Sequence, residues 1–160
     1  MKELLTEEKT LLAYLPKGEK MWAIALPCSL ELTKDGLPCV KNPETRVTLR
    51  KFRVERDLGV YTAKYGNHVF YLGTFQNPLG GKFKLYSFPV KHKEREECDA
   101  TLVMKSCEDL VAMCDKHGVS VCLLPQLEAK MDYLSFKNCY RDYINLILDD
   151  RFVMVHRKES

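Results

Sequence analysis

Residues 85–125 read LYSFPVKHKEREECDATLVMKSCEDLVAMCDKHGVSVCLLP, and this stretch decides the fold class. Two short apolar segments, residues 82–88 (KFKLYSF) and 119–124 (VSVCLL), predict strands. Between them, apolar residues recur at helical spacing over residues 99–117, with Asp99 in the N-cap position. A strand, a helix and a second strand in succession indicate an α/β fold in which helices cover a sheet.

The predicted helix has a defined end and a defined buried face. Gly118 follows its last turn, where a residue without a Cβ can adopt the left-handed conformation that ends many helices. Two of the seven cysteines lie on the buried face, where we expect them to pack as small hydrophobic side chains. The residues of this face are Val103, Cys107, Leu110, Val111 and Cys114.

The rest of the chain continues the alternation of strands and helices, which favours a mixed, largely parallel sheet. The apolar residues within positions 44–57 fit neither a helical nor a strand period. The sequence therefore does not decide whether this segment forms a helix or a strand. Pro27 is expected to end the strand before it. The further predicted elements are helices over residues 2–15 and from Ser135 onward, and strands over residues 21–26, 68–72 and 151–155.

Length and composition favour one soluble globular domain over residues 1–160. The chain is 46% hydrophobic and 29% charged, with a net charge of +3, too small to indicate nucleic-acid binding by itself. It has seven cysteines, no C-x-x-C pair, no signal peptide and no apolar run near 20 residues. We therefore expect a cytoplasmic protein without membrane contact, without a metal site and without disulfides.

Ligands of α/β sheets bind where strands end, which selects three predicted loops. These are residues 27–39, 89–98 and 125–135. None of them contains a Walker loop, a dinucleotide-binding fingerprint or a nucleophile elbow. Their polar residues are Ser29, Glu31, Lys91, His92, Gln126, Glu128, Lys130, Asp132 and Ser135.

Several segments, in this order and at this spacing, resemble the macrodomain family. Residues 85–125 resemble its strand with a Phe-Pro-x-Lys corner, followed by a long helix and a short strand that ends in Pro. Residues 14–18 (YLPKG) and 24–27 (IALP) are similar to the entry into its ligand-binding strand, and residues 66–73 (GNHVFYLG) resemble a segment of phage and bacterial members. The resemblance covers most of the chain and implies a divergent member of phage or viral origin, then located in the host cytoplasm.

The resemblance implies a three-layer α/β/α domain with a mixed, largely parallel central sheet that binds ADP-ribose or a related nucleotide, with no other cofactor. Macrodomains hold the ligand's diphosphate between two glycine-rich loops, whose backbone N–H groups bind the anion. The corresponding segments here, residues 38–43 and 126–133, contain no glycine, since none lies between Gly36 and Gly59 or after Gly118. The ligand-binding residues implied by the resemblance are Cys28, Ser29, Val90, Pro125, Gln126 and Phe136.

The resemblance extends to the glycohydrolases that remove ADP-ribose from acidic side chains. Their corner lysine corresponds to Lys91, their second-loop aspartate to Asp132, and a serine approximately to Ser29. An amine can attack the anomeric carbon or the open-chain aldehyde of a sugar while a carboxylate moves the protons. An ADP-ribosyl hydrolase that uses Lys91 and Asp132 is therefore one hypothesis.

Another hypothesis is a ligand-free domain that acts as an interaction module. A basic run surrounds Phe52, and Glu55 is the only acidic residue between positions 46 and 56. Such a run can contact an acidic protein partner or nucleic acid, although a solvated helix face gives the same pattern. The residues of the run are Arg46, Arg50, Lys51, Arg53 and Arg56.

Overall fold

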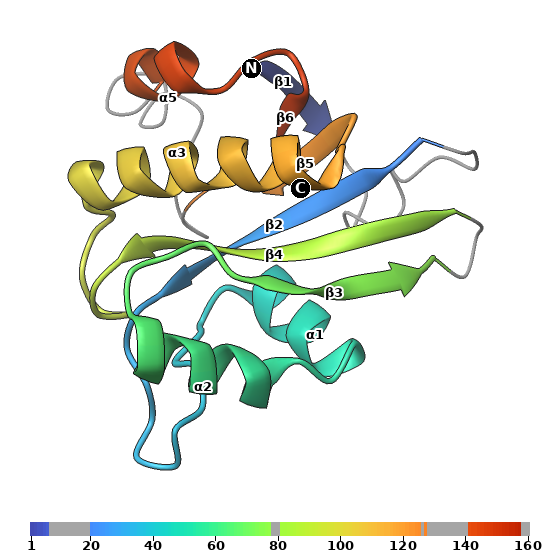
Figure 1. The fold of residues 1–160 in the computed structure, drawn as a ribbon. Helices are drawn as coiled ribbons and strands as arrows, with labels where there is room; N and C mark the ends of the chain where they lie inside the picture. The colour runs from blue at the N-terminus through green and yellow to red at the C-terminus, as the bar shows by residue number, and fades with distance from the viewer. Residues whose placement is uncertain (7–19, 78–80, 126, 128–140, 158–160) are drawn as a thin grey trace.

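The computed structural model describes residues 1–6, 20–77, 81–125, 127 and 141–157. Its described strands form one sheet in the order β1-β6-β5-β2-β4-β3 (Figure 1). Every neighbouring pair is parallel except β3 and β4. The predicted mixed, largely parallel sheet is therefore confirmed. The strands are β1 (Lys2–Thr6), β2 (Trp22–Ser29), β3 (Tyr71–Gln76), β4 (Lys82–Lys91), β5 (Val121–Pro125) and β6 (Phe152–Arg157).

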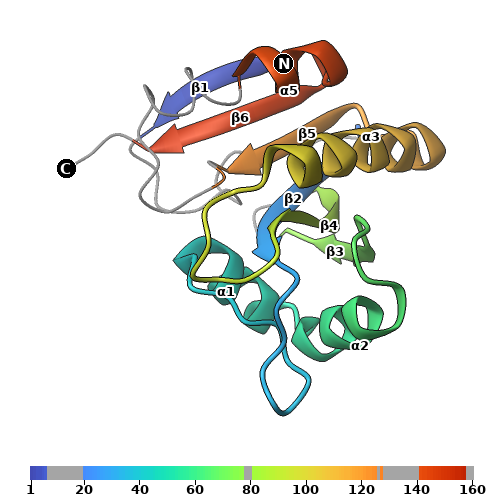
Figure 2. The same cartoon turned by 90° about the vertical axis from the view of Figure 1, so that its left-hand side faces the viewer.

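Helices cover both faces of this sheet. One face carries α3 (Ala100–His117) and α5 (Arg141–Ile147), and the other carries α1 (Pro43–Lys51) and α2 (Glu55–Tyr65). Figure 2 shows the sheet between these two layers, which gives the expected three-layer α/β/α arrangement. Within the described ranges, none of the helices has the length and the apolar composition needed to cross a membrane.

The two central strands, β2 and β4, contribute side chains to both hydrophobic cores. In β2, Ala23 and Ala25 face the α3 side, while Ile24 and Leu26 face the α1 side. The small alanines leave room for α3, whose buried face contains four of the five predicted residues, Val103, Cys107, Leu110 and Cys114. Val111 is only half-buried, and Leu102 and Ser106 are buried in addition. A continuous apolar run is typical of a strand that is covered on both faces, and β2 is such a strand.

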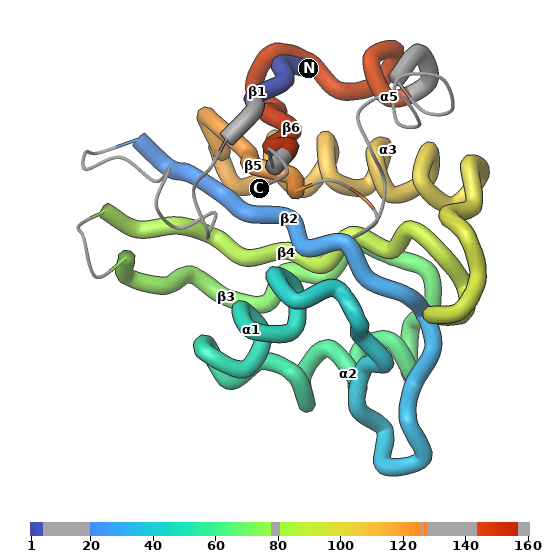
Figure 3. Tube along the Cα trace, turned by 180° about the vertical axis from the view of Figure 1, so that it is seen from behind, coloured from blue at the N-terminus to red at the C-terminus, as the bar shows by residue number. Residues whose placement is uncertain are grey.

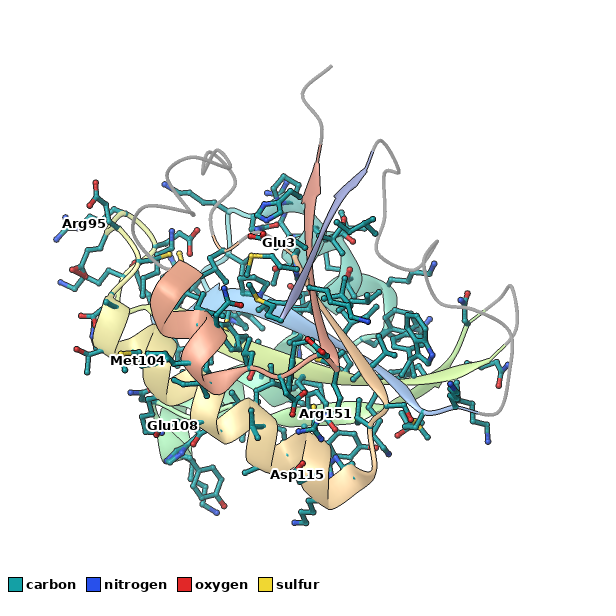
Figure 4. All side chains as sticks on the ribbon, turned by 90° about the horizontal axis from the view of Figure 1, so that it is seen from above. Glu3, Arg95, Met104, Glu108, Asp115 and Arg151 are labelled. Atoms are coloured by element: carbon teal, nitrogen blue, oxygen red, sulfur yellow. The ribbon has the colours of Figure 1, made fainter. Side chains whose placement is uncertain are left out.

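The long central helix matches its sequence signals at both ends. The Asp99 carboxylate accepts a hydrogen bond of 3.0 Å from the Leu102 backbone N–H, which satisfies one free donor of the first turn. Gly118 has a φ of +66° and ends the helix in the left-handed conformation. Near the same end, Arg151 bonds to Asp115 at 2.7 Å and so joins the segment before β6 to α3 (Figure 4).

The prediction of a helix over residues 2–15 is wrong for its first part, and residues 7–15 lie outside the described residues. Lys2–Thr6 form β1, which pairs in parallel with β6 over its whole length. The leucine spacing that suggested a helix contains no information about this long-range pairing. Hydrogen bonds to an otherwise open sheet edge outweigh a local preference of this size.

The predicted strands have somewhat different limits in the structure, and three of the five differ by three residues or more at one end. The strand predicted over 68–72 lies at Tyr71–Gln76, because His68 and Val69 belong to a turn that contacts α3. β2 continues past Pro27 to Ser29, and β4 continues past its own proline to Lys91. β2 pairs with β5 only as far as Ile24. On that side of the strand, no neighbouring strand at Pro27 needs an N–H donor, and a proline is therefore tolerated.

The region left open, residues 44–57, forms helices α1 and α2 with a sharp break between them. Asn42 caps α1 by accepting hydrogen bonds from two backbone N–H groups. At the break, Arg53 has a φ of +57°, and the Phe52 ring packs against Phe75 at a centroid distance of 4.8 Å. The break obscures the periodicity, because two short helices with different axes share one window of sequence. The predicted helix after Ser135 is described only from Arg141, where α5 begins.

We predict that Gly59→Ala destabilises the protein by about 1–3 kcal/mol, the usual cost of overpacking. A Cβ on Gly59 would collide with the backbone carbonyl oxygen of Gly36, where the loop after β2 runs beside α2 (Figure 3). Helix propensity alone would instead stabilise the variant by about 0.5–1 kcal/mol, so the two effects differ in sign. Urea unfolding measures the change, with the exposed Val60→Ala as the control. A stabilised Gly59→Ala would contradict the close approach.

We also predict that His117 stays neutral to a lower pH than an ordinary histidine. Burial, then Lys84 and Lys116, lower the pKa of His117 below 6.5. Its Nδ1 lies 2.6 Å from the Tyr86 hydroxyl, whose hydrogen a neutral ring can accept. The folded state therefore binds fewer protons than the unfolded state, so this stabilisation is complete above about pH 6.5 and is lost as the pH falls through the lowered pKa.

The measurement is an NMR titration of the His117 ring together with urea unfolding at several pH values. His117→Gln should lose less stability than the wild type between pH 7.5 and 5.5. A wild-type ring that titrates at or above 6.5 would contradict the prediction.

Candidate functional site

A cleft of about 370 Å³ lies at the carboxyl ends of β2 and β4. Parallel α/β sheets place their ligands at this edge, because the strands end there and loops with free side chains begin. The cleft walls come from the end of β2, the loop before α1, the end of β4 and the segment before α3. The lining residues are Pro27, Cys28, Val40, Lys41, Asn42, Val90, Lys91, Glu94, Arg95, Glu96, Glu97 and Leu127.

The residues implied as ligand contacts have different surroundings. Cys28, Val90 and Lys91 line the cleft. Ser29 does not line it, because its hydroxyl donates to the Cys39 carbonyl at 3.0 Å and accepts from the Glu31 N–H at 3.3 Å. Ser29 thus holds the loop after β2. Pro125 is the last residue of β5, while Gln126, Asp132 and Phe136 lie outside the described residues.

Cys28 lines the cleft, and burial shifts the acidity of its thiol. Burial raises the pKa of Cys28 from 9.0 to about 12, with a smaller contribution of the same sign from Glu94. A nucleophilic cysteine needs a thiolate near neutral pH, and the raised pKa disfavours that form of Cys28. This shift argues against Cys28 as a nucleophile, and the residue contributes shape to the cleft.

Lys91 lies inside the cleft beside a carboxylate that the sequence analysis did not single out. Its ammonium is 3.7 Å from Glu94 Oε1, and the same oxygen accepts a hydrogen bond of 3.1 Å from the Lys41 backbone N–H. Both side chains are largely buried, with 15% of Lys91 and 8% of Glu94 exposed. The hypothesis that pairs Lys91 with Asp132 concerns a residue outside the described part, whereas Glu94 is a partner that the structure describes. An acid three residues after the corner lysine is the signal that could have indicated it.

Several backbone N–H groups between β2 and the first turn of α1 are bonded to groups of the chain itself. The Cys39 N–H donates to the Glu31 carbonyl at 2.9 Å. Asn42 Oδ1 accepts from the Glu44 and Thr45 N–H groups at the start of α1. The loop that corresponds to the first glycine-rich loop is thus ordered by internal hydrogen bonds.

The charges that line the cleft balance. Lys41, Lys91 and Arg95 stand against Glu94 and two neighbouring glutamates. Figure 4 shows Arg95 at the periphery, on the segment that leads into α3. Among the described residues, no group of three His, Cys, Asp or Glu side chains could hold a metal ion.

Comparison with known proteins identifies the fold. No protein-family model and no curated protein matches the sequence. Among solved structures, a macrodomain protein from Streptomyces coelicolor is similar with a TM-score of 0.65 at 11% identity, over 99% of this chain and 100% of that chain. The macrodomain of Thermus aquaticus DarG is similar with a TM-score of 0.58 at 14% identity, over 98% of both chains.

Two larger proteins contain a region of similar structure. Thermosipho africanus DarTG, solved in complex with ADP-ribose, matches with a TM-score of 0.58 at 12% identity, over 85% of this chain and 38% of that chain. A tomato leucine aminopeptidase matches with a TM-score of 0.55 at 9% identity, over 98% of this chain and 32% of that chain. These likenesses agree with the layers and the strand order of the sheet. The chain has the macrodomain fold.

Proposed function

We propose that the cleft at the ends of β2 and β4 binds ADP-ribose or a related nucleotide. The observation that carries the proposal is the position of Lys91, a largely buried cation inside a cleft at the ligand-binding edge of a macrodomain fold. The ADP-ribose complex of Thermosipho africanus DarTG supports this choice of ligand. A cleft volume of about 370 Å³ lies in the range of small-molecule sites.

Each part of the ligand has a matching chemistry in the cleft. A diphosphate is an anion, and the Lys91 ammonium is the cation closest to the end of β4. Val40, Val90 and Leu127 offer apolar surface to a base or a ribose. Because the Cys39 and Lys41 N–H groups of its first loop bond to Glu31 and Glu94, the cleft offers fewer free backbone donors than a glycine-rich loop, and we expect weaker binding than in a site with free N–H groups.

We predict that Lys91→Ala lowers the affinity for ADP-ribose about tenfold, equivalent to about 1.4 kcal/mol. The variant removes the cation that would face the diphosphate. Lys93→Ala is the matched control, because Lys93 is an exposed lysine of the same segment that does not line the cleft. Calorimetric titration measures the affinity of both variants for ADP-ribose and for adenosine.

Adenosine carries no phosphate, so its affinity should be equal in the wild type and in Lys91→Ala. Absence of heat and of thermal shift at millimolar ADP-ribose in the wild type would contradict the proposed function.

We propose nucleic-acid binding as a second candidate function, on the surface of α1 and α2. All five basic residues of the run from Arg46 to Arg56 are exposed in the structure. The acidic residue within the run, Glu55, is 3.6 Å from Arg50 and offsets only part of this charge. Four of the five cations are arginines, whose planar guanidinium groups suit phosphate oxygens.

We predict that Arg46→Gln combined with Arg50→Gln weakens binding to a single-stranded oligonucleotide and lowers the slope of log K against log salt by about 1.4. Each lost phosphate contact accounts for about half of that change. The control is Lys2→Gln combined with Lys116→Gln, two exposed lysines of β1 and α3 away from this surface. Fluorescence anisotropy at several salt concentrations gives the slopes. Equal slopes for both double variants would exclude this surface.

A further inference from the structure

We infer that the Glu94 carboxylate occupies the position of a ligand's phosphate group and thereby disfavours phosphate-bearing ligands in the cleft. This inference rests on the proposed function, because it concerns the ligand preference of the same site. It identifies Glu94 as the residue that sets this preference. Three groups meet at this place: the Glu94 carboxylate, the Lys91 ammonium and the Lys41 backbone N–H.

Glu94 is bound in the way that proteins bind an anionic ligand. One oxygen, Oε1, accepts from the Lys41 N–H at 3.1 Å and lies 3.7 Å from the Lys91 ammonium. Lys41 belongs to the loop between β2 and α1, and Lys91 is the last residue of β4. A backbone N–H together with a lysine ammonium is a common donor set for a phosphate oxygen. The carboxylate therefore uses the donors that a phosphate in this cleft would need.

The burial of Glu94 makes the competition strong. Only 8% of its side chain is exposed, so water can replace few of its contacts while it stays in place. A buried carboxylate needs such partners, because removal of a charge from water is costly without them. Conversely, an entering phosphate gains the single Lys41 N–H only when Glu94 releases it, and it shares the Lys91 ammonium with Glu94 until then.

The competition has different consequences for different ligands. A ligand with a diphosphate must displace Glu94, or it must accept a second negative charge beside its own at Lys91. A nucleoside has no such group and leaves the contact intact. The wild-type cleft should therefore show a smaller preference for ADP-ribose over adenosine than a variant in which position 94 carries no charge.

A purely structural role for Glu94 predicts the opposite result. The carboxylate joins the loop before α1 to the segment before α3, residues 53 positions apart in the chain. If this contact only ordered the walls of the cleft, its loss would make the walls less ordered. The affinity for every ligand, including adenosine, would then fall. The two roles thus differ in the sign of the effect on ADP-ribose and in the effect on adenosine.

The experiment compares Glu94→Gln with Glu96→Gln. Both variants remove one negative charge from the lining of the same cleft, but Glu96 is exposed, whereas Glu94 contacts Lys41 and Lys91. Calorimetric titrations use ADP-ribose, adenosine and inorganic pyrophosphate as separate probes. We expect Glu94→Gln to bind ADP-ribose and pyrophosphate about tenfold more tightly than the wild type, and Glu96→Gln less than twofold. Adenosine affinity should not change in either variant.

Glu94→Asp is a second variant, which keeps the charge but shortens the side chain by one methylene. It should also bind pyrophosphate more tightly than the wild type, because its carboxylate has less reach toward the Lys41 N–H. Thermal unfolding of each variant shows that it is folded. This second variant keeps the inference open to test if Glu94→Gln does not fold.

Three results would overturn the inference: an unchanged or lower affinity of Glu94→Gln for ADP-ribose and pyrophosphate, an equal gain in Glu96→Gln, or a parallel loss of adenosine binding. Failure of the proposed function has a different signature. In that case neither ADP-ribose nor adenosine binds to the wild type or to any variant. The pyrophosphate titrations then still show whether Glu94 occupies an anion site.

Discussion

The parallel pairing of β2 with β4 at the centre of the sheet is the constraint on which the rest of the structure depends. Helices cover both faces of these strands, so most of their side chains are buried and apolar. At the carboxyl ends of the two strands, polar side chains appear at Ser29 and Lys91, which are in register with one another. The position of the cleft follows from this pairing, and the side chains at the strand ends determine what the cleft can bind.

Sequence analysis succeeded where local signals are strong. The helix from Ala100 to His117 has an N-cap, a periodic apolar face and a glycine end, and these signals agree with one another. It failed at Lys2–Thr6, because that strand depends on pairing with β6, about 150 positions away in the chain. Of the site residues, Lys91 was selected both by its place in a loop at a strand end and by the resemblance to a family. Glu94 follows Lys91 by three residues, a local signal for their ion pair, but its contact with Lys41 joins two loops and has no local signal.

The fold by itself leaves the function open, and the comparisons illustrate this. Similar layers occur in macrodomain structures and in a part of a leucine aminopeptidase. A shared scaffold fixes where a ligand can enter, while the chemistry belongs to the side chains at that place. Here those side chains are a lysine, a nearly buried glutamate and a thiol whose pKa is raised by burial. A nucleotide-binding interpretation therefore depends on Lys91 and Glu94 more than on strand order.

The missing glycines and the buried carboxylate have one physical explanation. A glycine-rich loop exposes backbone N–H groups that bond to a ligand's oxygens. All of these N–H groups have hydrogen-bond partners of this kind when the anion binds. In this chain Pro38 in the loop before α1 and Pro43 at the start of α1 have no N–H, and the Cys39 and Lys41 N–H groups of the loop bond to Glu31 and Glu94. The loop is thus held by hydrogen bonds within the chain. Under the inference drawn above, the bond between Glu94 and the Lys41 N–H opposes the entry of a phosphate.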